Sequence, residues 1–562
     1  MSRDSELTRR AFVTVAGGCV PAWGKMIEGK EVVVGSGAVA SEPEDTVRAA
    51  AAILEAGGNA MDAAAAAALV CGLLQPELCG PGGYVLCGLV LEGKTGRIWS
   101  LDANSVSPAA ARERMFEVLP LSSDRGGINA QEYHCAVRDD ANVLGPLAVG
   151  VPGQMAGLGI LWERWGRLKW PDIVAPSQRL VAAGIPYRIT ARSIAVQEKT
   201  LRRFEATSRL LMPDGRLPKP ADRWRPDDLA KTLTRLAAAG WRDFYEGELG
   251  RKIADFVSGA GGALSRADMA EFHPRVAEPY LTTYRGARVY SAALANGGLT
   301  VLQILNMLEC LAPASAGDVV YWHRLAEVLK LAWRDRLRYL GDPDGASVPV
   351  ERLLSKDYAA GRVETLRQFP DQVDRMPAVA AGSSPGTTHI SAADRDGNLV
   401  AVTVSHGGNF GSCLTVPGTG IILGHGMCRF DPRPGRPNSV GPRKRPLNNV
   451  CPTILRLPDR DVALGLRGGR RIVSSVAQVA ARIVDHGLTA LEAVEAPRMH
   501  VEEQEPLELM TTAGREPVEK LEAMGHRVRQ VERVGGWTHI VERLRNKGKI
   551  RAGSNIWSAG IE

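Results

Sequence analysis

The sequence predicts a layered α/β fold, in which strands alternate with long helices. Apolar, β-branched runs at 32–34, 388–393 and 399–404 indicate strands. Alanine- and leucine-rich segments such as 60–74 and 472–486 indicate helices. Hydrophobic residues make up 45% and charged residues 23% of the 562-residue chain, which is typical of a globular protein. The length exceeds one ordinary core, although a single large layered domain accommodates most of it.

The first two helices have recognisable ends. Residues 42–56 have helical composition, and Gly57-Gly58 ends this segment. Asn59 is suited to cap a second helix from Ala60 to about Leu74, because its side-chain oxygen can accept a hydrogen bond from a free backbone amide. The alanines at 63–68 allow that helix to pack closely against a neighbour.

A glycine-rich turn, Gly80-Pro81-Gly82-Gly83, precedes a predicted strand at 84–91. The lysine and hydroxyl residue of a phosphate-binding P-loop do not follow it, so no phosphate site is predicted. Further helices are predicted at 300–311 and 323–340.

A hairpin is predicted around Asp396-Gly397, which joins the runs 388–393 and 399–404. Thr387 lies where a segment of small residues, 378–386, enters the first of these strands. On this stretch alone, Thr387 is an ordinary residue at the start of a hairpin.

Cleavage between Gly386 and Thr387 would change the chemistry of this threonine. Its new α-amine, with a pKa of roughly 7.7–8.0, could accept the proton of its own hydroxyl near neutral pH. A terminal amine is a known way to activate a threonine nucleophile. Gly386 suits the cut because a residue without Cβ tolerates strain and leaves its carbonyl approachable.

An ordered series of motifs extends from about residue 32 to about residue 553. It includes Ala56–Ala64, Gly80–Gly83, Gly150–Gly153, Phe244–Gly247, Leu264–Met269, Thr387-Thr388-His389, Asp394–Asn398, Phe410–Ser412, Val416–Ile421, Lys444–Leu447 and Cys451–Ile454. The series resembles the gamma-glutamyltransferase (glutathione hydrolase) family of N-terminal-nucleophile hydrolases. The resemblance implies a four-layer αββα sandwich of two stacked sheets between helices, formed by a large subunit (26–386) and a small subunit (387–562) cut from one precursor.

The resemblance also assigns catalytic roles. Thr387 matches the nucleophile that opens the small subunit, and Ser405 matches a second hydroxyl residue, usually threonine, that supports it. Gly468 and Gly469 match the glycine-rich segment whose backbone amides stabilise the oxyanion. Without the family context, Ser405 is equally well read as a solvent-facing strand residue.

Three positions depart from the family's pattern for a glutamyl group. Arg429 stands where relatives place an aspartate for the α-amine, Gly426 where they place a glutamine, and Gly407 where they place an asparagine. Two like charges at ~4 Å repel by roughly 1 kcal/mol in water and about 4 kcal/mol at an effective dielectric of 20. Arg429 therefore suits a second carboxylate better than an ammonium.

Other predicted substrate contacts are less regular. Asn448 and Asn449 replace paired serines and retain the ability to hydrogen-bond a carboxylate or amide. The arginine for the α-carboxylate falls among Arg112, Glu113 and Arg114; strict alignment gives Glu113, and a small shift gives either arginine.

The leading hypothesis is a self-processing threonine amidohydrolase or acyltransferase. It would cleave a γ-glutamyl (glutathione-like) or related acyl amide through an acyl-enzyme, with water or an amine as acceptor. The alternatives are an acylase or amidase for a dicarboxylic mono-amide of glutaryl or oxamate type, and an unprocessed scaffold without catalysis.

No cofactor or metal is predicted. The nine cysteines include no Cys-x-x-Cys pair, and His389, His406 and His425 lack a helical metal-ligand spacing. Cys71, Cys87 and Cys310 are expected to be buried. A net charge of +7 with scattered basic residues is a weak case for nucleic-acid binding.

Residues 1–25 resemble a twin-arginine export start, with Arg9-Arg10 followed by an apolar run. This favours a periplasmic or secreted protein; the alternative is an unstructured tail on a cytoplasmic one. No later segment approaches the ~18–20 apolar residues of a membrane span.

Overall fold

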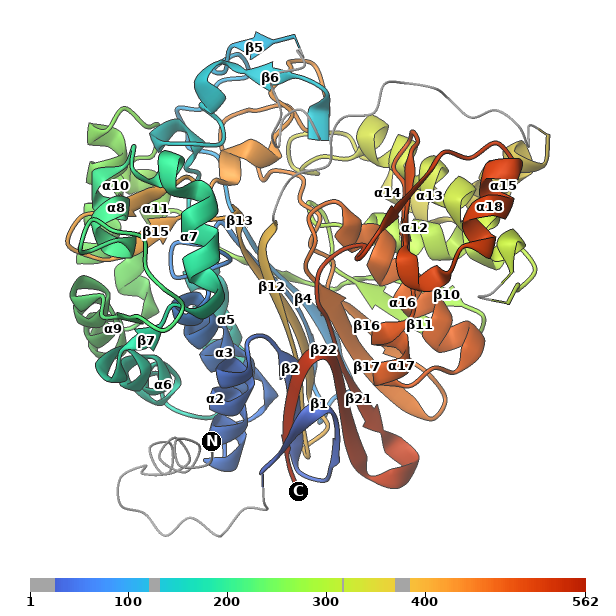
Figure 1. Cartoon of the computed structure of the whole chain (residues 1–562), viewed down its shortest axis with the longest axis horizontal. Helices are drawn as coiled ribbons and strands as arrows, with labels where there is room; N and C mark the ends of the chain where they lie inside the picture. The colour runs from blue at the N-terminus through green and yellow to red at the C-terminus, as the bar shows by residue number, and fades with distance from the viewer. Residues whose placement is uncertain (1–25, 121–131, 316–317, 369–384) are drawn as a thin grey trace.

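The computed structural model describes residues 26–120, 132–315, 318–368 and 385–562 (Figure 1). The first 25 residues, on which the export prediction depends, lie outside this part. Among the described residues, no helix combines the length and apolarity that crossing a bilayer requires.

Thirteen strands of the described chain form one antiparallel sheet at the centre of the molecule (Figure 1). In spatial order they are β10 (Tyr280–Tyr284), β11 (Ala287–Ser291), β16 (Thr453–Arg456), β17 (Arg460–Leu466), β21 (Thr538–Leu544), β22 (Lys549–Ile561), β2 (Gly37–Ser41), β12 (Pro385–Asp394), β13 (Leu399–Gly408), β3 (Val85–Leu91), β4 (Ile98–Asn104) and β9 (Arg275–Ala277), with β1 (Met26–Val34) also paired to β22. The sheet folds back on itself, because β17 and β21 contact β12 although neither is hydrogen-bonded to it.

Three apolar cores separate four layers. Along β13, Val400, Val402 and Val404 pack into a core with the helices on one side, whereas Leu399 and Ala401 pack into a second core between the two halves of the sheet. This follows from the two-residue period of a strand. On the opposite half, the even residues of β17 from Val462 to Leu466 pack into the third core, against the other helices.

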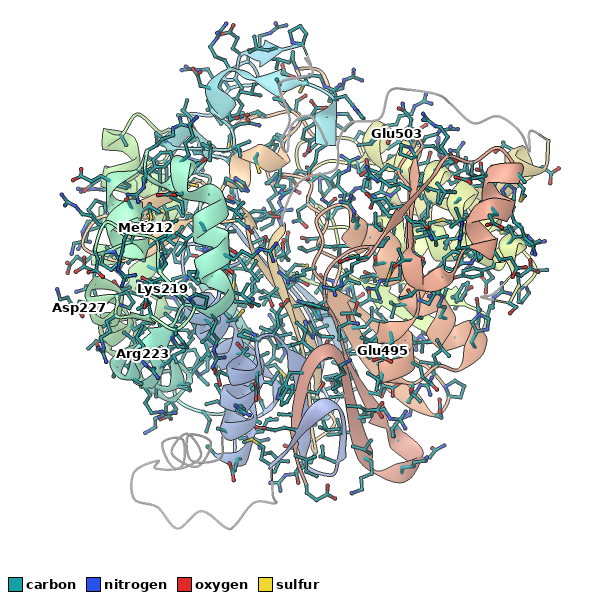
Figure 2. The ribbon with its side chains drawn as sticks, viewed as in Figure 1. Met212, Lys219, Arg223, Asp227, Glu495 and Glu503 are labelled. Carbon is teal, nitrogen blue, oxygen red and sulfur yellow. The ribbon has the colours of Figure 1, made fainter. Side chains whose placement is uncertain are left out.

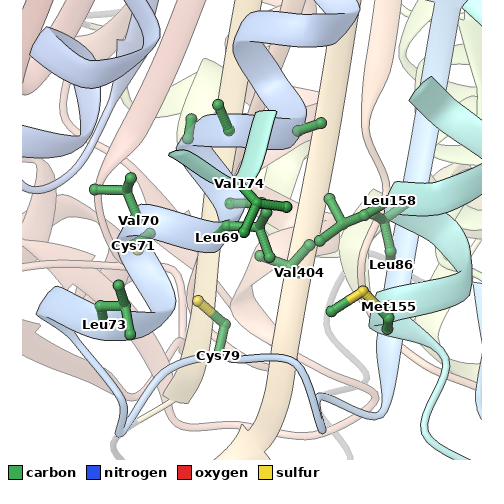
Figure 3. Packing of buried hydrophobic residues seen from close by; sticks show 14 of the residues in the cluster. Leu69, Val70, Cys71, Leu73, Cys79, Leu86, Met155, Leu158, Val174 and Val404 are labelled. Carbon is green, nitrogen blue, oxygen red and sulfur yellow. The ribbon is translucent and has the colours of Figure 1, made fainter. Parts of the chain in front are cut away.

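One outer layer consists of helices that pack on β2, β12, β13, β3 and β4. Its main members are α2 (Glu44–Glu55), α3 (Ala60–Leu74), α5 (Gln154–Trp165) and α6 (Trp170–Ala183), extended by α7 (Arg188–Leu201), α8 (Glu205–Leu211), α9 (Asp227–Ala239), α10 (Glu248–Gly259) and α11 (Arg266–Ala270). Figure 3 shows Leu69, Val70 and Leu73 of α3 among Leu86, Leu158, Val174 and Val404 from neighbouring elements.

The other outer layer packs on β10, β11, β17 and β21. It contains α12 (Gly298–Glu309), α13 (Val319–Tyr339), α14 (Val350–Leu354), α15 (Lys356–Gln368), α16 (Arg471–His486), α17 (Ala490–Glu495) and α18 (Glu516–Ala523). In Figure 2, Met212 and Asp227 are labelled in the first helical layer, and Glu495 and Glu503 in the half of the molecule that contains the second.

Within the described residues, four small sheets lie outside the central one. They are β5–β6 (Val118–Leu119 and Ala136–Val137), β7–β8 (Ile185–Pro186 and Arg223–Trp224), β14–β15 (Leu414–Val416 and Ile421–Leu423) and β18–β19–β20 (Met499–His500, Leu507–Met510 and Val528–Val531).

The predicted four-layer αββα architecture is confirmed, with one difference. The two stacked halves are continuous, because β22 pairs with both β21 and β2 and so bridges them. The Asn59 cap is also confirmed: its side chain accepts from the amides of Met61 and Asp62. Cys71 and Cys87 are buried as expected, whereas Cys310, at the end of α12, is only half-buried.

Candidate active site

Thr387 lies near the start of β12, in a hairpin with β13 that confirms the predicted one. Thr387 pairs with Ser405, whereas Gly386 pairs with Gly407, so the register shifts by one residue at the predicted cleavage point. The strand is continuous across this point. Thr387 is 4% exposed.

The Ser405 hydroxyl connects the nucleophile to the bond that it would attack. Ser405 Oγ lies 2.9 Å from Thr387 Oγ1, 2.6 Å from the carbonyl oxygen of Gly386 and 2.8 Å from the amide nitrogen of Gly407. A serine hydroxyl has one proton, and a carbonyl oxygen can only accept. Ser405 therefore donates to Gly386 and accepts from Gly407 and from Thr387 Oγ1.

Gly386 is held in close contact with two backbone carbonyls. A Cβ on this residue would lie 2.2 Å from the oxygen of Gly408 and 3.0 Å from that of Glu77. Backbone atoms cannot move aside as a flexible side chain can. The missing Cβ is thus a packing requirement of the shifted register.

No histidine contacts Thr387 Oγ1 among the described residues, where Ser405 is its one side-chain partner. His389, on the same face of β12, contacts Thr403 and Ser391, and burial together with nearby His539 holds its pKa well below the usual range. Burial also lowers the pKa of His406 to about 3. Among the described side chains, only the hydroxyl of Ser405 is within reach of the Thr387 hydroxyl proton.

Gly468 and Gly469 lie between the end of β17 and the start of α16. Their φ angles are 144° and 60°, values that favour glycine. Among the described residues, neither backbone amide donates a hydrogen bond within the protein. His389 connects this segment to β12, because its ring lies against Gly465, three residues before Gly468. The geometry provides free amides at a helix start, as an oxyanion site requires.

A second glycine pair, Gly535-Gly536, packs against Gly468 and the residue before it. A Cβ on Gly468 would lie 2.6 Å from the Cα of Gly535, and the amide of Gly536 donates to the carbonyl of Arg467. The Gly535-Gly536 pair was visible in the sequence as a turn signal, but nothing there connected it to Gly468.

Arg429 is buried beside Glu132, with which it forms an ion pair. Its second terminal nitrogen donates to the carbonyl of Gly407 at 2.9 Å, and its guanidinium lies 6.0 Å from the centre of the Tyr84 ring. Burial alone would lower the pKa of Arg429, but the adjacent Glu132 carboxylate raises it. The positive charge of Arg429 is thus already compensated by the carboxylate of Glu132.

The spaces next to Gly407 and Gly426 are filled. A Cβ on Gly407 would lie 2.2 Å from the ring of His425, and one on Gly426 would lie 2.4 Å from Ser105 Oγ. His425 accepts from the Gly408 amide at 2.5 Å, and burial lowers its pKa to about 3. The neutral ring of His425 thus fills the space that a side chain at residue 407 would need.

Asn448 and Asn449 lie side by side but differ in availability. The Asn448 side chain donates to Asn296 at 2.8 Å and accepts from the amide of Val450 at 3.0 Å. Asn449 accepts from Arg336 at 2.9 Å, and within the described residues its amide nitrogen makes no hydrogen bond. Asn449 is therefore the better placed of the two to contact a ligand.

Arg112 and Arg114 are exposed, and neither side chain has a hydrogen-bond or ion-pair partner among the described residues. Glu113, between them, accepts from the Gly435 amide at 2.7 Å. It thereby anchors the short connection between Asp431 and Pro442. The structure brings Ser405 to Thr387 and places the two arginines at the surface.

Comparisons with known proteins agree with this geometry. The family model for gamma-glutamyltranspeptidase matches residues 46–562. The chain belongs to the gamma-glutamyltranspeptidase family. It is therefore an enzyme of the N-terminal-nucleophile hydrolase class.

Both hydrolases and acylases of this family resemble the chain. An acylase ACY 1 proenzyme from Pseudomonas sp. (strain SE83) is 34% identical over 520 residues, which cover 91% of this chain and 90% of the relative. A glutathione hydrolase proenzyme from Bacillus subtilis (strain 168) is 31% identical, covering 89% and 86% respectively. The crystal structure of cephalosporin acylase from Bacillus halodurans superposes with a TM-score of 0.82 at 27% identity, covering 96% of this chain and 97% of that one.

Proposed function

We propose that this gamma-glutamyltranspeptidase-like amidohydrolase cuts its own Gly386–Thr387 bond and then uses Thr387 as its nucleophile. The observation that carries the proposal is the position of Ser405, whose hydroxyl donates to Gly386 O at 2.6 Å while it accepts from Thr387 Oγ1 at 2.9 Å. One hydroxyl thus contacts both the nucleophile and the carbonyl to be attacked.

Self-cleavage would begin with attack of Thr387 Oγ1 on the carbonyl carbon of Gly386. Thr387 Oγ1 passes its proton to Ser405 Oγ while Ser405 passes its own proton to the Gly386 oxygen, so the tetrahedral intermediate is neutral. The carbonyl then re-forms as the C–N bond breaks, the proton on that oxygen passes to the Thr387 nitrogen, and an ester joins Gly386 to Oγ1. Water hydrolyses this ester and leaves Gly386 with a free carboxylate and Thr387 with a free amine.

The mature enzyme would repeat the chemistry on a substrate amide. The Thr387 amine takes the hydroxyl proton, Oγ1 attacks the acyl carbon, and the amides of Gly468 and Gly469 stabilise the oxyanion. The leaving amine takes the proton as the acyl-enzyme forms. Water, or an acceptor amine, then attacks the ester and frees Thr387.

Between the two acyl groups considered, the surroundings of Arg429 favour a dicarboxylic mono-amide such as a glutaryl amide. A γ-glutamyl group carries an α-ammonium, which needs an unpaired carboxylate, and the Glu132 carboxylate beside Arg429 is already paired. The similarity to an acylase proenzyme and a cephalosporin acylase supports the same choice. Asn449 is the proposed donor to the distal carboxylate, while Arg112 and Arg114 remain candidates at the surface.

Turnover of two matched anilides tests this choice. Glutaryl and γ-glutamyl p-nitroanilides have the same leaving group and differ by the α-ammonium. We expect faster release of nitroaniline from the glutaryl compound, and no release from either compound by Thr387→Ala. Preferential turnover of the γ-glutamyl compound would instead support glutathione-type hydrolysis.

We also propose that the two chains remain associated as a heterodimer, because β12 of the small-subunit region pairs with β2 of the large one. Export through residues 1–25 is a further proposal. Cell fractionation with and without Arg9-Arg10→Lys-Lys tests it, and cytoplasmic retention of the unaltered protein would contradict it.

A further inference from the structure

A cluster of histidine and carboxylate side chains lies on α13, in the second helical layer and outside the candidate active site. His323 and Glu327 are one helical turn apart on α13, and His526 approaches them from the segment before β20. One potential ligand atom from each residue lies within 4.8 Å of the other two. His526 is buried, and the other two are partly exposed.

A buried carboxylate fixes the orientation of His526. Its Nδ1 lies 2.5 Å from Glu505 Oε1, and its Nε2 lies 2.8 Å from His323 Nδ1. Because a carboxylate accepts the Nδ1 proton, the Nε2 lone pair points to His323. Metal-binding histidines commonly donate their other ring N–H to a carboxylate in this way, which fixes the orientation of the ring.

The distances between the candidate ligand atoms range from just below to above the distance expected between neighbouring ligands of a zinc ion. Bonds of ~2.1 Å at tetrahedral angles put neighbouring ligand atoms about 3.4 Å apart. The two histidine nitrogens are slightly closer than this, at 2.8 Å, and the largest ligand separation does not exceed 4.8 Å. The two nitrogens share a hydrogen bond in this structure, so the rings must move apart to admit the ion.

Two carboxylates lie at the site. Lys330 lies 2.7 Å from both Glu327 and Glu505, and Arg324 is a second positive charge near His323. Lys330 engages Glu327 Oε1, and Oε2 has no hydrogen-bond partner among the described residues.

We propose that His323, Glu327 and His526 bind one Zn²⁺ ion, with water in the fourth position. Two imidazoles and a carboxylate are a ligand set that zinc prefers. The site would join α13, in the 26–386 region, to the segment before β20, in the 387–562 region. The ion would therefore hold together two parts of the chain that lie on either side of the Gly386–Thr387 bond.

Metal content and titration test the site in the purified full-length protein, whether or not it is cut. We expect about one zinc per chain by mass spectrometry of the metal, and saturable Zn²⁺ binding by calorimetry after chelation. His323→Ala and His526→Ala should abolish this binding, and Glu505→Gln should weaken it about 10- to 100-fold. Cobalt in place of zinc should give visible absorption bands that both histidine variants lack.

His486→Ala is the matched control, since His486 is an exposed histidine at the end of α16. It should bind zinc as the unaltered protein does. The site is refuted if the unaltered protein binds no zinc, or if zinc binding persists in both His323→Ala and His526→Ala. Comparable circular dichroism of all variants confirms that a loss of binding is not a loss of folding.

Discussion

Ser405 donates a hydrogen bond of 2.6 Å to the carbonyl oxygen of Gly386, the residue that precedes the proposed nucleophile. The same oxygen of Ser405 accepts from Thr387. These contacts polarise the Gly386 carbonyl and orient the hydroxyl of the proposed nucleophile. It also makes the role of Ser405 separable by mutation from that of Thr387.

Ser405→Ala should slow self-cleavage by roughly 10²- to 10³-fold, the usual effect of removing one oxyanion donor. The measurement is the rate at which the full-length band disappears on a denaturing gel. Ser405→Thr retains the hydroxyl and should cut at a similar rate to the unaltered chain. Ser391→Ala, a buried serine on β12 that contacts His389, is the control. Normal cutting by Ser405→Ala would remove Ser405 from the mechanism.

Gly386→Ala should impair cutting for a steric reason. The new Cβ would lie 2.2 Å from the carbonyl oxygen of Gly408, so the shifted register between β12 and β13 must change. We expect the half-time of cleavage to lengthen at least tenfold. Gly361→Ala, at a helical glycine of α15 with nothing within 4 Å of the added Cβ, should cut normally. Equal cleavage rates for both variants would show that cutting does not depend on the shifted register between β12 and β13.

Glu132→Gln should destabilise the protein by about 3–5 kcal/mol, because it leaves the buried Arg429 charge uncompensated. Denaturation in urea measures the change. Adding Arg429→Met to Glu132→Gln should recover part of the loss. Glu117→Gln, which breaks an exposed pair with Arg138, should have no measurable effect. A Glu132→Gln protein as stable as the unaltered one would mean that Arg429 has another partner.

Acid should weaken the attachment of α16. Arg471 and Arg529 lower the pKa of Glu508 from 4.5 to about 2, against the opposing effect of burial. Because the pKa of Glu508 is lower in the folded state, its contribution to the free energy of unfolding is complete above pH 4.5 and is lost as the pH falls toward 2. This contribution is on the order of 3 kcal/mol. Glu508→Gln should remove that part of the pH dependence. Identical slopes of stability against pH in both proteins would contradict this assignment.

Local features were predictable from the sequence because neighbouring residues determine them. The Asn59 cap, the Asp396-Gly397 hairpin and α16 each depend on residues within a few positions of one another. The structure extends the same hairpin by one pair and so places Thr387 opposite Ser405. Roles that came from the family resemblance, such as that of Gly468 and Gly469, remain predictions.

Long-range relationships were not predictable. Glu132 and Arg429 are 297 positions apart, and nothing in either segment indicates the other. β2 and β22, from opposite ends of the chain, join the two halves of the sheet. The spacing of His323 and Glu327 was visible on a predicted helix, but His526 lies 203 positions beyond His323.

The intact mass of the purified protein tests the central claim most directly. We predict two chains, the smaller one spanning residues 387–562 and beginning with Thr387, and a single uncut chain for Thr387→Ala. A protein that hydrolyses its amide substrate while its mass is that of the uncut chain would contradict the account.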